Sequence, residues 1–161
     1  MIEDGILFTD LFHFTAGPYL NAVQQDSIQV LWEADRPAAA RIAWGTSLPH
    51  SEQVELKANG DRRRSYEISG LQADTPYFYE ITLLDDRGQK IRSGNLTFRS
   101  APVGGQPLSF VVIGDSEARP FVNDQVAKQV GGERPHMLVL VGDLTDGGQR
   151  NDRFQWTHEY F

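Results

Sequence analysis

Two short apolar runs in this chain each end in Gly-Asp, and the two aspartates lie 28 residues apart. Residues 108–113 precede Gly114-Asp115, and residues 137–141 precede Gly142-Asp143. The stretch between the runs has the right length for a crossover helix, so we expect two neighbouring parallel strands. Both carboxylates would then emerge at one edge of the sheet, about 4.8 Å apart. Carboxylates at that spacing can bind one hard cation.

The chemistry that follows from such a pair is phosphoester hydrolysis. Two metal ions about 3.5–4 Å apart can share one bridging carboxylate, lower the pKa of a bound water and hold phosphate oxygens. Glu117 lies two residues beyond Asp115 and is a candidate third metal ligand, with a solvated loop acid as the alternative. Aspartate after a strand also commonly caps the next helix, which is the non-catalytic interpretation of each Gly-Asp pair.

The elements that must position these carboxylates are a strand–helix–strand unit and a further helix. Residues 120–130 carry valines at every fourth position, which predicts one apolar helical stripe. Pro120 suits the first helical turn, and Gly131-Gly132 suits the helix end. Residues 151–161 are predicted to be helical as well. This half of the chain is therefore expected to be an α/β unit with open strand edges, marginally stable by itself.

The preceding half has the alternating pattern of a β-sandwich. About seven short strands are expected between residues 18 and 98, because apolar and polar residues alternate there. Leu71, Thr75 and Tyr77 have the spacing of a tyrosine corner, in which the hydroxyl of a tyrosine at a strand start bonds to the chain upstream. Residues 101–107 hold two prolines and two glycines and are expected to link the two halves.

Composition excludes several classes of protein. The chain has 161 residues, a net charge of -7 and a pI near 5.0, which argues against a nucleic-acid or anionic-membrane partner. It contains no cysteine, so disulfides, Cys-ligated zinc and iron–sulfur clusters are excluded. No apolar run approaches the roughly 20 residues of a membrane span.

The segment from Phe110 to Asp115, followed by Gly142-Asp143-Leu144-Thr145-Asp146, resembles the start of a calcineurin-like metallophosphoesterase domain. The sandwich in front of it, with Gly17-Pro18-Tyr19-Leu20 and residues 28–33, resembles a fibronectin type III domain. Together they make the chain similar to the purple acid phosphatase family. The resemblance implies a lead-in at 1–16, a fibronectin III-like domain at 17–101 and a partial metallophosphoesterase domain at 108–161.

The resemblance also implies roles for individual residues. Asp115 matches the aspartate that holds the first metal, and Asp143 matches the aspartate that bridges two metals. Full-length relatives use a dinuclear centre of iron, zinc or manganese to hydrolyse phosphate esters. Glu117 stands where many relatives have histidine. Asp146 stands where purple acid phosphatases have the tyrosine that gives their colour, so no purple colour is expected.

The later histidine blocks of the family do not occur in these 161 residues. We therefore expect the chain to be the amino-terminal part of a phosphoester hydrolase, with no complete set of catalytic residues and no activity in isolation. The alternative is a non-catalytic β-sandwich that binds a partner and carries a vestigial α/β segment. Relatives are often exported, whereas this amino terminus carries no export signal, so the compartment is left open.

Overall fold

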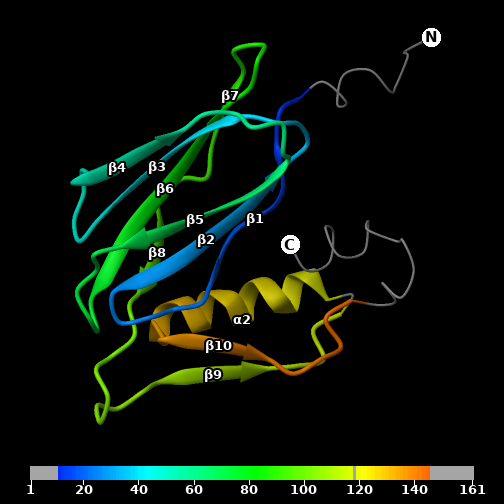
Figure 1. Ribbon diagram of the computed structural model, residues 1–161. Helices are drawn as coiled ribbons and strands as arrows, with labels where there is room; N and C mark the ends of the chain where they lie inside the picture. The colour runs from blue at the N-terminus through cyan, green and yellow to red at the C-terminus, as the bar shows by residue number, and fades with distance from the viewer. Residues whose placement is uncertain (1–10, 118, 146–161) are drawn as a thin grey trace.

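The computed structural model describes residues 11–117 and 119–145. Eight strands form two facing sheets, and a strand pair with one helix lies beside them, below the sheets in the view of Figure 1. The elements of the sandwich are β1 (Phe14–Asn21), β2 (Ser27–Ala34), β3 (Ala39–Gly45), β4 (Glu52–Leu56), β5 (Arg63–Ser69), β6 (Pro76–Leu84), β7 (Lys90–Arg92) and β8 (Leu96–Arg99). They are followed by β9 (Phe110–Ile113), α2 (Pro120–Glu133) and β10 (Met137–Leu140).

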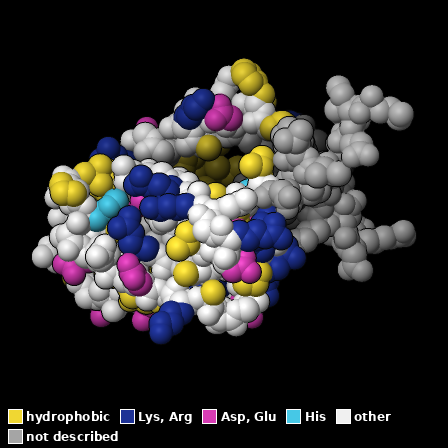
Figure 2. All heavy atoms as spheres, turned by 90° about the horizontal axis from the view of Figure 1, so that it is seen from above, with side chains coloured by type: hydrophobic (Ala, Val, Ile, Leu, Met, Phe, Trp, Pro, Cys, Tyr) yellow, Lys and Arg dark blue, Asp and Glu magenta, His cyan; other side chains and the backbone are white. Residues whose placement is uncertain are grey.

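The two sheets of the sandwich are antiparallel. One has the strand order β1-β2-β5, and the other has the order β4-β3-β6-β7, with β8 also pairing with β6. Alternate residues of β2, β3 and β6 face inward, as their apolar–polar alternation predicts. The side chains that are almost completely buried between the sheets are Ile28, Val30, Trp32, Ile42, Ile68, Ile81 and Leu83. Figure 2 shows a hollow on the upper face with hydrophobic side chains at its floor.

The predicted tyrosine corner is present between β5 and β6. The Gln72 N–H donates a hydrogen bond of 2.9 Å to the Tyr77 hydroxyl. Ser100 is completely buried against the same turn, and its Oγ accepts a bond from the Thr75 N–H at 3.0 Å. These bonds hold the turn between the sheets in one conformation.

The α/β unit has the predicted parallel pair. β9 and β10 run in the same direction, with Phe110 opposite Met137 and Ile113 opposite Leu140. The strands are shorter than the apolar runs, since residue 108 and residue 141 lie outside them. Several large apolar side chains of this unit are exposed, including Phe110 at 55% and Phe121 at 73%.

The helix end differs from the prediction. Helix α2 continues through Gly131 and Gly132 to Glu133, and Arg134 takes the left-handed conformation (φ 48°) that ends it. The physical reason lies in Pro135, because a residue before proline is sterically disfavoured in the right-handed helical region. The Arg134 N–H still bonds to the Val130 carbonyl at 3.2 Å, which closes the last turn.

The sandwich begins earlier in the chain than residue 17. Phe12 is buried in the core, and β1 starts at Phe14. The predicted helix at 151–161 and Asp146 lie outside the described residues. Within the part that is described, the fold is mostly β with one helix, in agreement with the coarse prediction.

Candidate metal centre

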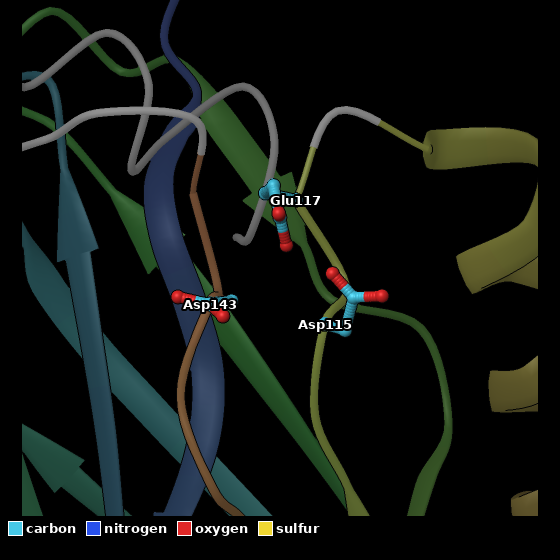
Figure 3. Close-up of side chains that lie close together, drawn as sticks. All are labelled: Asp115, Glu117 and Asp143. Carbon is cyan, nitrogen blue, oxygen red and sulfur yellow. The ribbon is translucent and has the colours of Figure 1, made fainter.

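The three predicted metal ligands lie together at the carboxyl ends of β9 and β10. Asp115 and Glu117 follow β9, and Asp143 follows β10. One carboxylate oxygen from each residue lies within 4.8 Å of the other two. Figure 3 shows Glu117 above the two aspartates in this view, with its side chain directed down toward the space between them. Oxygen ligands about 2.1 Å from a tetrahedral zinc ion are about 3.4 Å from one another, so side-chain rotations that move the oxygens by about 1 Å would bring this group to ligation distance.

Backbone hydrogen bonds continue the strand pairing into the loops that carry these residues. The Asp115 N–H donates to the Gly142 carbonyl at 3.2 Å. The Asp143 carbonyl accepts two bonds, from the Ser116 N–H at 2.8 Å and from the Glu117 N–H at 3.1 Å. The backbone of Asp143 therefore holds the loop that presents Asp115 and Glu117. The three carboxylates are brought together by main-chain contacts that need no ion.

The two aspartates share an uncommon backbone conformation. Asp115 has φ 57° and Asp143 has φ 48°, both in the left-handed region that aspartate tolerates better than most residues. The glycine before each aspartate permits either a close contact or a backbone conformation that a side chain would disfavour. A Cβ atom on Gly114 would lie 2.8 Å from Cγ2 of Val141, and Gly142 has φ 111°. Each Gly-Asp pair thus turns its strand end sharply and leaves the carboxylate at the sheet edge.

The charges of this group favour a cation. Three carboxylates converge, while the nearest described positive group is Arg119, whose Nη1 lies 3.8 Å from Oδ2 of Asp115. That ion pair is exposed and therefore weak. The Glu117 Oε2 atom is buried and has no hydrogen-bond partner among the described residues. A buried carboxylate oxygen without a partner is costly, and a bound cation would satisfy it. The residues present therefore fit a metal ion.

Two further polar residues belong to the strand–helix–strand unit, one beside the carboxylates and one at the far end of the strands. Asn123, in the first turns of α2, donates from its side-chain amide to the Ser116 carbonyl and so holds the loop of Asp115 against the helix. No spacing or motif in the sequence pointed to Asn123. His136 precedes β10 and lies at the opposite, amino end of the strand pair, as expected from its position in the chain.

Comparison with known proteins relates the fold to two solved structures. No protein-family model matches the chain, and no curated protein matches it. The structure of PhoD matches with a TM-score of 0.61 and 13% identity over 81% of this chain. Purple acid phosphatase PPD1 from yellow lupin (Lupinus luteus) seeds matches with a TM-score of 0.58 and 17% identity over 78% of this chain. The chain spans 28% of the length of each.

A fibronectin type III domain of human fibronectin type III domain containing protein 3 covers 56% of the chain at 16% identity and a TM-score of 0.43. At that TM-score the likeness does not by itself establish the fold. The two longer matches extend across both the sandwich and the α/β unit, since each covers more than three quarters of the chain. The described part therefore shares its fold with PhoD and with a purple acid phosphatase. Within that part, no helix is long and apolar enough to cross a bilayer.

Proposed function

We propose that this chain is the amino-terminal part of a metal-dependent phosphoester hydrolase. It consists of a fibronectin III-like domain, which begins by Phe12 rather than at residue 17 and extends to residue 101, and a partial metallophosphoesterase domain at 108–161. Asp115, Glu117 and Asp143 are its metal ligands. The observation that carries the proposal is the convergence of these carboxylates, from two neighbouring parallel strands, to within 4.8 Å of one another. The fold shared with a purple acid phosphatase supports the same conclusion.

The roles of the three residues are those that the resemblance to the purple acid phosphatase family implies. Asp143, which follows β10, would bridge two ions. Asp115 holds the first ion from the neighbouring strand, and Glu117 supplies an oxygen that is already desolvated. When bound, iron, zinc or manganese would lower the pKa of water and neutralise charge on phosphate oxygens. Arg119 is close enough to this edge to contact a phosphate oxygen if its exposed pair with Asp115 opens.

We further propose that the 161 residues bind metal without turning over substrate. The described group consists of carboxylates alone, and His136 lies at the far end of the strands. Phosphoester cleavage also requires a proton for the leaving group, which imidazole commonly supplies. No imidazole belongs to the described group, so it offers no such donor. The partner that such a site would serve is a phosphate ester held by the complete enzyme.

Titration of the purified chain with Mn²⁺, followed by loss of the free-ion EPR signal, tests the metal site. We expect saturable binding in the wild type and at least tenfold weaker binding in Glu117→Gln, because loss of a residue that merely orients a metal ligand already costs about 10–100-fold in affinity. The matched control is Asp124→Asn, which removes an exposed carboxylate on α2 whose partner is Lys128. Equal affinity in the wild type, E117Q and D124N would contradict the assignment and favour the binding-module alternative.

Catalysis is tested separately with p-nitrophenyl phosphate and saturating Mn²⁺ or Zn²⁺. We expect no turnover above the metal-only background. Turnover that disappears in Asp115→Asn would contradict the proposal that this chain lacks part of its catalytic machinery.

A further inference from the structure

The tyrosine corner presents an aspartate to the α/β unit. Asp74 lies in the turn that Tyr77 and Ser100 hold, and it has φ 51°. The Asp74 N–H bonds to the Ala101 carbonyl at 3.0 Å, so the backbone on both sides of this residue is restrained. The Arg99 Nε lies 2.7 Å from Oδ1 of Asp74. The Asp74 carboxylate is therefore fixed in position and direction although it is about half exposed.

The imidazole of His136 joins this aspartate to both strands of the α/β unit. Its side chain is 11% exposed, and Nε2 lies 3.0 Å from Oδ1 of Asp74. The Ser109 N–H donates to Nδ1 at 3.1 Å, and the Ser109 Oγ lies 3.0 Å from the same nitrogen. The His136 N–H donates in turn to the Ser109 carbonyl at 3.0 Å. His136, which directly precedes β10, thus contacts both the residue before β9 and the sandwich.

These contacts determine the tautomer of the ring. A nitrogen that accepts a hydrogen bond from a backbone N–H carries no proton, so Nδ1 is unprotonated. The proton of the neutral ring must then lie on Nε2, where it is donated to the Asp74 carboxylate. Each ring nitrogen has one distinct function, since Nδ1 joins the two strands and Nε2 joins the strands to the sandwich.

The rest of the junction is open. A cavity of about 180 Å³ lies between Tyr77 and Phe98 of the sandwich and Val130 and Pro135 of the α/β unit. A wider groove of about 800 Å³ runs along β1 and reaches Pro135, His136 and Met137. Because the cavity reaches Pro135 and the groove reaches His136, apolar packing alone does not fix the orientation of the two parts. The directional hydrogen bonds of the His136 ring set the orientation of the α/β unit on the sandwich.

We infer that His136 is a positioning residue that docks the β9–α2–β10 unit on the tyrosine corner through Asp74 and ties β9 to β10 through Ser109. The register in which β9 and β10 pair at their amino ends determines which residues lie opposite one another at their carboxyl ends. A slip of one residue would turn Asp115 and Asp143 to different faces. This consequence for the metal site rests on the proposed function, whereas the docking role does not.

Two substitutions separate the functions of the ring. The amide nitrogen of Gln in His136→Gln takes the place of Nε2 and keeps a donor for Asp74, but it provides no acceptor for Ser109. The amide oxygen of Asn in His136→Asn takes the place of Nδ1 and keeps that acceptor, but it does not reach Asp74. H136Q should therefore loosen the strands and leave the docking intact, and H136N should do the opposite. A matched control is His13→Gln, since His13 is exposed and bonds to the Leu11 carbonyl.

The experiment uses the full chain labelled with ¹⁵N. In the wild type, ¹⁵N shifts of His136 should identify the Nε2–H tautomer, and R2/R1 ratios of residues 110–140 should equal those of the sandwich. H136Q should raise amide exchange at Ser109 about 2- to 12-fold, the change expected from one net hydrogen bond, with R2/R1 unchanged. H136N and Asp74→Ala should lower R2/R1 in residues 110–140 alone, with Ser109 still protected. H13Q should leave both measurements at their wild-type values.

The outcomes decide the inference without reference to activity. Identical behaviour of H136Q and H136N, or an Nδ1–H tautomer in the wild type, would overturn it. Labelling of Ser109 by a fluorophosphonate would also overturn it, since Ser109, His136 and Asp74 would then act as a nucleophilic triad rather than as a structural link. If the wild type fails to bind Mn²⁺, the proposed function fails and these measurements still stand. If it binds, H136Q should weaken Mn²⁺ binding about 2- to 12-fold and H13Q should not.

Discussion

Replacement of Asp143 by asparagine should change stability and metal affinity in opposite directions. Asparagine has the same shape as aspartate and tolerates the left-handed φ of 48° at this position. The backbone carbonyl of residue 143 would still accept the N–H groups of Ser116 and Glu117. The loop is therefore expected to keep its conformation, and the substitution removes only the charge.

The size of the stability change in the metal-free chain follows from the distances between the carboxylates. Asp143 lies within 4.8 Å of two other carboxylates. Two unit charges at that distance repel by about 0.9 kcal/mol in the dielectric of water, and ordinary salt reduces this by roughly half. With two such pairs relieved, Asp143→Asn should stabilise the metal-free protein by about 1 kcal/mol at low to moderate salt.

The effect of Asp143→Asn on metal binding is unfavourable. A divalent ion about 2.2 Å from a carboxylate oxygen gains about 4 kcal/mol from that charge even in the dielectric of water. If the neutral amide oxygen recovers half of this, about 2 kcal/mol is lost, which corresponds to roughly 30-fold weaker binding.

Urea unfolding in EDTA and Mn²⁺ titration provide the two measurements. Asp124→Asn is the control, and its exposed pair with Lys128 should matter by less than about 0.5 kcal/mol. The stabilisation of D143N in EDTA should shrink as salt is added, because it arises from exposed charges. A metal-free D143N chain that is less stable than the wild type, with unchanged Mn²⁺ affinity, would refute the reasoning.

Two further predictions concern the tyrosine corner and its aspartate. Tyr77→Phe removes the bond of 2.9 Å from the Gln72 N–H and should cost about 1 kcal/mol in the free energy of unfolding, measured by urea denaturation; no change would mean that water replaces the hydroxyl fully. The Arg99 side chain, and then His136, lowers the pKa of Asp74 below its ordinary value. A lowered pKa stabilises the folded state above the ordinary value near 4, and this contribution disappears as pH falls through the folded-state pKa. The stability difference between the wild type and Asp74→Asn should therefore be present at about pH 7 and vanish at about pH 2, and a difference that is independent of pH would contradict this.

Sequence reasoning succeeded where local periodicity is sufficient. The sandwich strands follow from alternation in stretches such as 27–34 and 76–84, because each buries one face against the opposite sheet. The spacing of Leu71 and Tyr77 predicted the corner, since that motif is closed by a bond only five residues long in sequence. The end of α2 was misjudged because the steric effect of Pro135 outweighed the preference of glycine for helix ends.

At the candidate metal centre, the sequence by itself determined the types of residue and their order. Gly-Asp after each of two apolar runs, separated by a helix, requires that Asp115 and Asp143 leave the same edge of a parallel pair. Only the tertiary structure decided that the Asp143 carbonyl holds the loop of Glu117, and that Asn123 braces it. It also decided that His136, at the amino end of β10, links the strands to Asp74, 62 residues away. Contacts between residues so far apart in the chain depend on how complete elements pack, and a local pattern of side chains does not predict them.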